Sequence, residues 1–235
     1  EEDYVPLTSD EDAEYDRIIN IDLSTLKPMI ACPHSPDNVV EVKTLSDVKV
    51  DQVCIGSCTN SSMLDMLTVA AMLRGKTVHP DVSLSISPGS KQVYTMLAEC
   101  GALADLIAAG ARILECACGP CIGMGFSPKS AGISLRTFNR NFEARSGTAD
   151  AGVYLVSPET AVAAALTGEI TDPRLLGEMP EIKMPESFKI NDSAVIPPAP
   201  ESVADSIEVL RGPNIKPFPK SKPQQDTLTA ELALK

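Results

Sequence analysis

The chain has 235 residues and is 43% hydrophobic, so it can bury a sizeable core in one full domain and still carry further segments. Its 20 Lys and Arg against 32 Asp and Glu give a net charge of −12, which disfavours binding to a nucleic-acid backbone. Trp is absent and aromatic residues are only 4%, so the core must be aliphatic. The sequence shows no signal-peptide pattern and no apolar run of about 18 residues. We expect no membrane partner and a cytoplasmic location, or the mitochondrial matrix if the source is eukaryotic.

The two ends of the chain differ in composition from its middle. The opening EEDYVPLTSDEDAEYD is acidic and has no hydrophobic period, so we expect residues 1–19 to be an exposed connection from preceding domains. Residues 20–195 are expected to form one domain. Prolines are concentrated in residues 196–225, which predicts an extended linker. Residues 226–235 alternate apolar and polar side chains, like the first strand of a further domain that is cut short.

Short apolar runs in the middle of the chain predict buried strands at 50–57, 82–87, 112–117 and 152–157. Helical spacing follows the first strand over residues 58–75 and the second over residues 91–110, with an interruption near Gly101. A last helix is expected from Pro158 to a stop at Gly168. The first helix has three residues available as its N-terminal cap, namely Thr59, Asn60 and Ser61.

The alternation of strands and helices predicts an α/β fold, with a parallel sheet joined by right-handed crossovers and helices on both faces. In such sheets the functional groups gather just beyond the carboxyl ends of the strands. Cys58, residues 87–90 and Cys118 all fall at such ends. We therefore expect three separate loops to converge at one edge of the sheet.

Seven cysteines without secretory features favour a reducing compartment and thiol or metal chemistry. The tetrapeptide CGPC at 118–121 also serves as a redox dithiol in thioredoxin-like proteins, but the glycines and Pro128 that follow oppose the helix that such a dithiol opens. A zinc ribbon would need a second close pair. We interpret Cys32, Cys54 and Cys100 as buried small hydrophobic residues, and the role of Cys116 stays open.

Cys58, Cys118 and Cys121 then remain as three thiols without an obvious fourth ligand. Thiolates are soft ligands that select iron–sulfur clusters or zinc over hard ions. Three of them suit an iron–sulfur cluster in which one iron stays open. Such an iron can act as a Lewis acid.

Four motifs, in the order CIGSCTNSS, ISPGS, CGPCIGMG and SLRTFNRNFEARSG, resemble the aconitase superfamily of aconitase, homoaconitase and the large subunit of isopropylmalate isomerase. The resemblance covers residues 20–175 and implies the third domain of such an enzyme, followed by the linker to its swivelling fourth domain. It implies an aconitate hydratase of the tricarboxylic acid cycle that isomerises citrate and isocitrate through cis-aconitate. The PHSPDNV block and the fused linker favour this over the alternatives, homoaconitase and 3-isopropylmalate dehydratase large subunit. A non-catalytic metal- or redox-binding module is the alternative from a different class.

The resemblance also implies a role for each matching residue. Cys58, Cys118 and Cys121 are expected to hold a [4Fe-4S] cluster whose fourth iron binds the hydroxyl and carboxylate of a tri- or dicarboxylate substrate. The proton-abstracting base is expected in a missing domain, either fused or in a separate chain. The chain alone is therefore predicted not to turn over.

Further matching residues lie around this cluster. Arg140 and Arg145 correspond to substrate-facing arginines, and Asn139 corresponds to a cluster-contacting asparagine. A guanidinium suits a carboxylate because it binds bidentately and keeps its charge, although a surface or capping role is the plain alternative for each arginine. Asn60 and Ser61 are expected either to hydrogen-bond the cluster or to cap the helix.

Overall fold

The computed structural model describes residues 5–208, 210–217, 219–223, 226, 227 and 229. The chain divides into two units, Glu1–Ile190 and Asn191–Lys235. In the second unit the described residues include one short helix, α5 (Glu201–Ala204), and are nearly all exposed. The linker and swivel-domain assignments stay predictions, and the strand expected at 226–235 lies mostly outside the described residues. No helix in the described part of the chain is long and apolar enough to cross a membrane.

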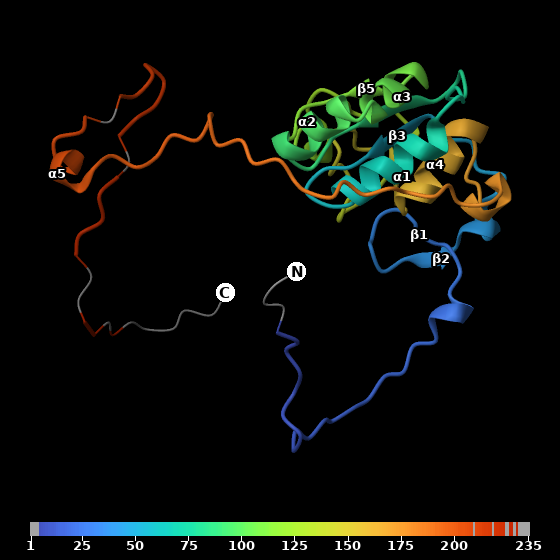
Figure 1. Ribbon diagram of the computed structural model, residues 1–235, viewed down its shortest axis with the longest axis horizontal. Coiled ribbons are helices and arrows are strands. Elements are labelled where there is room, and N and C mark those ends of the chain that lie inside the picture. The colour runs from blue at the N-terminus through green and yellow to red at the C-terminus, as the bar shows by residue number, and fades with distance from the viewer. Residues whose placement is uncertain (1–4, 209, 218, 224–225, 228, 230–235) are drawn as a thin grey trace. The chain divides into compact units, whose positions relative to one another are not determined.

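A seven-stranded sheet forms the centre of the first unit, in the order β2-β1-β7-β6-β3-β4-β5 (Figure 1). The strands are β1 (Met29–Ala31), β2 (Val39–Glu41), β3 (Gln52–Ile55), β4 (Ser83–Ile86), β5 (Arg112–Ile113), β6 (Ile133–Arg136) and β7 (Gly152–Leu155). The pairs among β3 to β7 are parallel, and β1 is antiparallel to both β2 and β7. The expected strands at 50–57, 82–87 and 152–157 are confirmed as β3, β4 and β7.

The other strands differ from the sequence prediction. The strand expected at 112–117 is only two residues long, because the chain turns into the cysteine loop after Leu114. β6 was not predicted: its residues ISLR alternate apolar and polar side chains, so no apolar run marks it. The hairpin of β1 and β2 was also missed, since strands of three residues leave too little pattern to detect.

Four α-helices follow the strands: α1 (Met63–Leu73), α2 (Lys91–Glu99), α3 (Ala102–Ala108) and α4 (Pro158–Thr167). The predicted interruption is confirmed at Gly101, which has φ 82°, and the predicted stop is confirmed at Gly168, which has φ 81°. The cap of α1 is Ser62, so the cap predicted among the three residues before it is wrong. The Ser62 hydroxyl accepts from the Asp65 N–H at 3.2 Å, and the Asp65 carboxylate accepts from the Ser62 N–H at 2.9 Å.

The two faces of the sheet carry different side chains. α1 contacts α2, α3 and α4, and the buried residues of this helical layer share one hydrophobic cluster with Val53, Ile55, Leu84, Ile86 and Leu135. The alternating strand positions point to the opposite face and are also buried, namely Gln52, Cys54, Ser85, Ser134 and Arg136. The loop that follows β5 covers this second face and contains the 3-10 helix η3 (Pro120–Ile122). The α/β class is confirmed, with a sheet that is mostly parallel but mixed. The four α-helices are gathered on the apolar face, so the expectation of helices on both faces is not met among the described residues.

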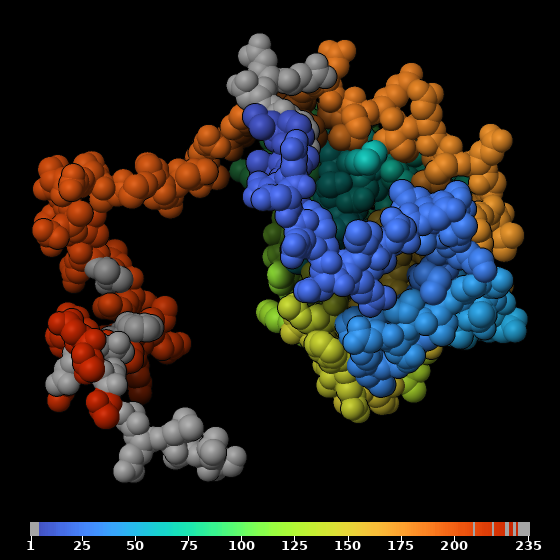
Figure 2. Space-filling model, turned by 90° about the horizontal axis from the view of Figure 1, so that it is seen from below, coloured from blue at the N-terminus to red at the C-terminus, as the bar shows by residue number. Residues whose placement is uncertain are grey.

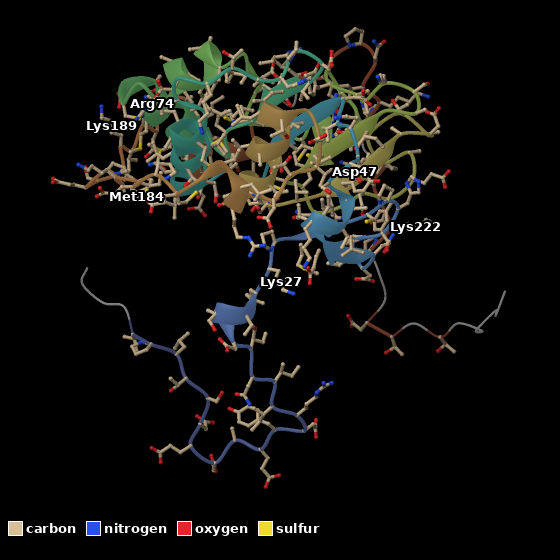
Figure 3. The ribbon with its side chains drawn as sticks, turned by 90° about the vertical axis from the view of Figure 1, so that its right-hand side faces the viewer. Lys27, Asp47, Arg74, Met184, Lys189 and Lys222 are labelled. Atoms are coloured by element: carbon tan, nitrogen blue, oxygen red, sulfur yellow. The ribbon has the colours of Figure 1, made fainter. Side chains whose placement is uncertain are left out.

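Two further segments are attached to the sheet and the helices. The Asn141 side chain donates to the carbonyls of Cys32 at 2.8 Å and Val153 at 3.1 Å. These bonds tie the hairpin of β1 and β2 to the chain after β6, and Figure 2 shows that hairpin in light blue beside the yellow part of the chain. Residues 177–190 run along the helical layer, where Lys189 forms an ion pair with Glu99 at 2.7 Å. Figure 3 shows Met184 and Lys189 on the same side of the molecule as Arg74.

Candidate functional site

A small hollow lies at the carboxyl edge of the sheet, where the residues after β3 and β6 meet the loop after β5. It is lined by Ser57, Cys58, Cys118, Cys121, Phe138, Asn139, Arg140 and Arg145. Three segments that are far apart in the sequence therefore contribute to one site. The structure brings together six of the seven cysteine, asparagine and arginine residues that the sequence predicts for the site, and the seventh, Asn60, does not line the hollow.

The loop that carries Cys58 is fixed by close backbone contacts at the end of β3. Gly56 has φ 81°, and a Cβ atom there would lie 2.2 Å from the carbonyl oxygen of Ser87 at the end of β4. Only glycine fits this close approach. The Gly56 N–H donates to the Thr137 hydroxyl at 2.9 Å, just after β6. The position of Cys58 is therefore set by three neighbouring strands.

Asn60 and Ser61 hold the same loop in place. The Asn60 side chain donates to the Thr137 carbonyl at 2.6 Å, and the Ser61 hydroxyl donates to the Ser57 carbonyl. The Gly89 N–H donates to the Ser61 carbonyl at 3.1 Å, so the ISPGS turn packs on this loop. Neither side chain caps α1, and neither lines the hollow. Their contact with a cluster stays a prediction.

The loop that carries Cys118 and Cys121 folds back on itself. The Met124 N–H donates to the Gly119 carbonyl at 2.9 Å. Gly123 has φ 82°, and a Cβ atom there would lie 2.4 Å from the Ser146 carbonyl oxygen. The loop therefore packs tightly against the chain that follows β6, and this contact brings its thiols to the hollow.

The three thiols of the hollow act on one another. Burial raises the pKa of the Cys121 thiol, and the neighbouring thiols of Cys118 and Cys58 raise it further, because thiolates repel each other. The Ser57 hydroxyl and the Arg136 guanidinium oppose this rise. The Asn139 side-chain amide lies 3.9 Å from the Cys58 sulfur, within the range of a weak hydrogen bond to sulfur. The three thiols therefore face the same hollow.

The donor set fits an iron–sulfur cluster. Cys58, Cys118 and Cys121 are all free and supply soft sulfur ligands. No three His, Cys, Asp or Glu side chains of the described residues are grouped so as to hold a single metal ion. In a cluster each thiolate binds a different iron, so the sulfurs need to surround the cluster and not meet at one point.

The remaining cysteines lie elsewhere. Cys54 is buried on β3, as predicted, and Cys32 is half-buried beside β1. Cys100 is exposed, so its predicted burial is wrong: it follows the last turn of α2, where its thiol donates to the Leu97 carbonyl at 3.6 Å. Cys116 is exposed in the cysteine loop and does not line the hollow.

Arg140 and Arg145 lie on the segment after β6. Arg140 is exposed and Arg145 is half-buried, and both line the hollow. Among the described residues, neither arginine forms an ion pair. Two guanidinium groups at a hollow can bind carboxylates bidentately.

Sequence reasoning missed three residues of this region. Ser57 and Phe138 line the hollow, and Arg136 is fully buried beneath it. The signal for the first two was their position directly beside motif residues. The signal for Arg136 was its alternation with Ser134, which places both on the polar face of β6.

Residues 1–168 match the Aconitase family, described as aconitate hydratase. The chain belongs to the aconitase family. This match includes all three segments of the hollow, so the geometry above is that of an aconitase-family domain.

Several curated relatives are named 3-isopropylmalate dehydratase large subunit. The protein from Clostridium botulinum (strain Alaska E43 / Type E3) is 46% identical over 170 residues, which is 72% of this chain and 40% of the relative. A protein from Methanopyrus kandleri is 45% identical over 170 residues, or 72% of this chain and 41% of the relative. One from Thermotoga maritima is 42% identical over 177 residues, which is 74% of this chain and 42% of the relative. The chain thus spans about 40% of the length of these relatives.

Proposed function

We propose that this chain is the cluster-binding part of a 3-isopropylmalate dehydratase, a hydro-lyase of the aconitase family. The sequence favoured aconitate hydratase and its place in the tricarboxylic acid cycle, with the isopropylmalate enzyme as an alternative. The names of the relatives support that alternative instead. The PHSPDNV block is therefore not a sufficient sign of aconitate hydratase. The observation that carries the proposal is the hollow where three free thiols and two guanidinium groups meet.

The residues of the hollow have different roles in the proposed dehydration. Cys58, Cys118 and Cys121 would hold a [4Fe-4S] cluster, which when bound supplies an open iron that acts as a Lewis acid toward a hydroxyl group. Arg140 and Arg145 bind the carboxylates of the substrate and orient its hydroxyl-bearing carbon. The Asn139 amide donates a weak hydrogen bond to the Cys58 sulfur at 3.9 Å and so helps to orient that ligand.

The proton-abstracting base is assigned to another part of the enzyme, as the sequence predicts. The relatives bear the name large subunit, which supports a partner subunit or domain that completes the site. A hydroxy-dicarboxylate would then lie between the hollow and this partner. Closure of the partner would exclude water and strengthen the electrostatic interactions inside the site.

The cluster is tested first, on the chain by itself. After anaerobic reconstitution we expect about four irons and four sulfides per chain, and mild oxidation should remove one labile iron and give the EPR signal of a three-iron cluster. A stoichiometric zinc ion, or a reversible disulfide between Cys118 and Cys121 without iron, would instead support the non-catalytic module.

The substrate is tested on the complete enzyme that contains this chain, by following the absorbance of the unsaturated intermediate. We expect turnover with 3-isopropylmalate, and faster turnover with citrate would restore the aconitate hydratase assignment. Arg140→Lys and Arg145→Lys should each lower kcat/KM roughly ten- to a hundredfold, because an ammonium cannot reproduce the bidentate contact. Unchanged kcat/KM in both variants would remove these arginines from the substrate site.

A further inference from the structure

Arg136 is a cation buried in the polar face of the sheet. Its side chain is fully buried on β6, three positions before Asn139. It forms no ion pair with a carboxylate of the described residues. A buried charge without an opposite charge is costly, so the fold must compensate it with hydrogen bonds or with an anion that arrives later.

The bonds of Arg136 run to two different parts of the molecule. On the sheet, its Nε donates to the Ser134 hydroxyl at 3.0 Å and its Nη2 donates to the Gln52 Oε1 at 2.8 Å. On the cysteine loop, Nη1 donates to the Pro120 carbonyl and Nη2 donates to the Phe126 carbonyl at 3.3 Å. These two carbonyls lie on either side of Cys121. The guanidinium therefore joins the loop to the sheet at both ends of the segment that carries this thiol.

The surroundings of Arg136 reinforce the same connection. The Gln52 side chain accepts from Arg136 and also donates to the Ser127 carbonyl at 3.0 Å, which adds a third bond to the loop. The guanidinium carbon lies 5.3 Å from the centre of the Phe138 ring, and Phe138 lines the hollow. Arg136 thus lies behind two parts of the lining of the hollow, the cysteine loop and the Phe138 ring.

We propose that Arg136 is a positioning residue that holds the Cys118–Cys121 loop in the shape that receives the cluster and places a buried positive charge behind its thiolates. This rests on the proposed function, because a cluster held by thiolates is the anion that the buried charge lacks. Arg136 does not reach the hollow itself. It acts on the site through the loop carbonyls and through Phe138.

The loop-holding role is tested on the chain without a cluster, by hydrogen exchange of residues 118–127 and by the alkylation rates of Cys118 and Cys121. In Arg136→Met we expect the exchange rates and the alkylation rates to rise roughly tenfold or more, since hydrogen bonds of a charged group are lost. The rise should be smaller in Arg136→Lys. Arg112→Met is the matched control. Arg112 also donates to a carbonyl of this loop, that of Gly125 at 3.0 Å, but it is exposed, so its loss should change the rates by less than about threefold.

The charge is tested on the reconstituted chain, by the rate at which a chelator removes iron and by the EPR signal of the oxidised cluster. We expect Arg136→Met to lose iron roughly tenfold faster than Arg136→Lys, which keeps the charge.

If both variants fail to fold, as judged by circular dichroism, Ser134→Ala loosens the guanidinium and should raise the same rates. Equal exchange, alkylation and iron loss in folded variants and the parent would overturn this inference. A parent chain that binds no cluster would overturn the proposed function, whereas the exchange and alkylation measurements would still test the loop.

Discussion

The two faces of the sheet are both buried, but they are buried by different interactions. On the helical face, residues such as Val53, Ile86 and Leu135 pack into one aliphatic cluster with α1 to α4. On the opposite face, Gln52 and Arg136 make hydrogen bonds to the carbonyls of the cysteine loop. Apolar packing is non-directional, whereas hydrogen bonds fix both distance and angle. The helical face is thus suited to stabilise the fold, and the polar face is suited to hold one loop in one position.

This difference implies that fold stability and site geometry can be changed separately. A substitution on the helical face should lower the free energy of unfolding and leave the thiols of the native chain unaffected. A substitution on the polar face should change the reactivity of the thiols and lower the free energy of unfolding by less. The following variants test that separation, beginning with the largest expected effect.

Cys118→Ser should abolish cluster binding, because a hydroxyl is a poor substitute for a thiolate on iron. We expect the cluster absorbance and the iron content after reconstitution to fall to background. The unfolding free energy of the cluster-free chain should change by less than about 0.5 kcal/mol, since Cys118 is exposed. Cys116→Ser is the matched control, because Cys116 lies in the same loop outside the hollow and its loss should leave the iron content unchanged. Full iron content in Cys118→Ser would contradict the ligand assignment.

Leu135→Ala and Ser134→Ala are neighbours on β6 that point to opposite faces, and both are fully buried. Leu135→Ala should lower the free energy of unfolding by about 2–5 kcal/mol, because it leaves a cavity in the aliphatic cluster. Ser134→Ala should lower it by about 1 kcal/mol, because one hydroxyl hydrogen-bonding group is lost. Urea denaturation gives both values. Alkylation of Cys118 and Cys121 under native conditions should be faster only in Ser134→Ala, and faster alkylation in Leu135→Ala would break the separation of the two faces.

Gly123→Ala and Gly125→Ala test the packing of the cysteine loop. Both glycines have positive φ, so alanine costs about 1–2 kcal/mol of backbone strain at either position. Only at Gly123 would the new methyl group meet the Ser146 carbonyl, whereas nothing lies within 4 Å at Gly125. Gly123→Ala should therefore displace the loop and release iron to a chelator faster than Gly125→Ala does. Equal iron release from the two variants would mean that this contact does not shape the site.

Asp172→Asn is expected to have the smallest effect. The Asp172 carboxylate accepts hydrogen bonds from Arg174, which lower its pKa, just before the 3-10 helix η4 (Pro173–Leu176) that packs on α4. A lowered pKa in the folded state stabilises the protein above the unfolded pKa of about 3.9, and this stabilisation is lost as the pH falls through the folded pKa. The substitution should cost about 1 kcal/mol at pH 7 and almost nothing at the acid end.

Urea denaturation at several pH values measures this dependence. Asp47→Asn, at an exposed position, is the control and should change stability by less than about 0.5 kcal/mol at every pH. The thiol reactivity of Asp172→Asn should equal that of the parent, because the residue lies on the helical side. A cost that is the same at pH 7 and in acid would rule out the charged hydrogen bonds as its cause.

The helical face could be predicted from the sequence, whereas most of the polar face could not. β3, β4 and β7 follow from apolar runs, and the limits of α4 follow from Pro158 and Gly168, because these signals are local. β6 was missed because Ser134 and Arg136 break its apolar run, and their burial depends on the loop that lies over them. A buried arginine is detectable only when its acceptors are known.

The hollow shows the same limit. The motifs singled out its cysteines and arginines because their spacing resembles that of a family. The same motifs left the cap of α1 wrong, since Asn60 and Ser61 are used in contacts to Thr137 and Ser57, which are tertiary or loop contacts. Cys100 was placed in the core because free cysteines usually are buried, but its position at the end of α2 is exposed.

The strand order has a consequence for the timing of biosynthesis. β6 enters the sheet between β3 and β7, and Thr137 at its end binds the loop of Cys58. At about 5–20 residues per second, a ribosome needs on the order of ten seconds to pass from Cys58 to Arg145. During that interval Cys58 has left the ribosome without its final neighbours. A cluster-delivery system would therefore find a complete set of ligands only after β6 has been inserted, so metal loading should follow synthesis of this part of the domain and not accompany it.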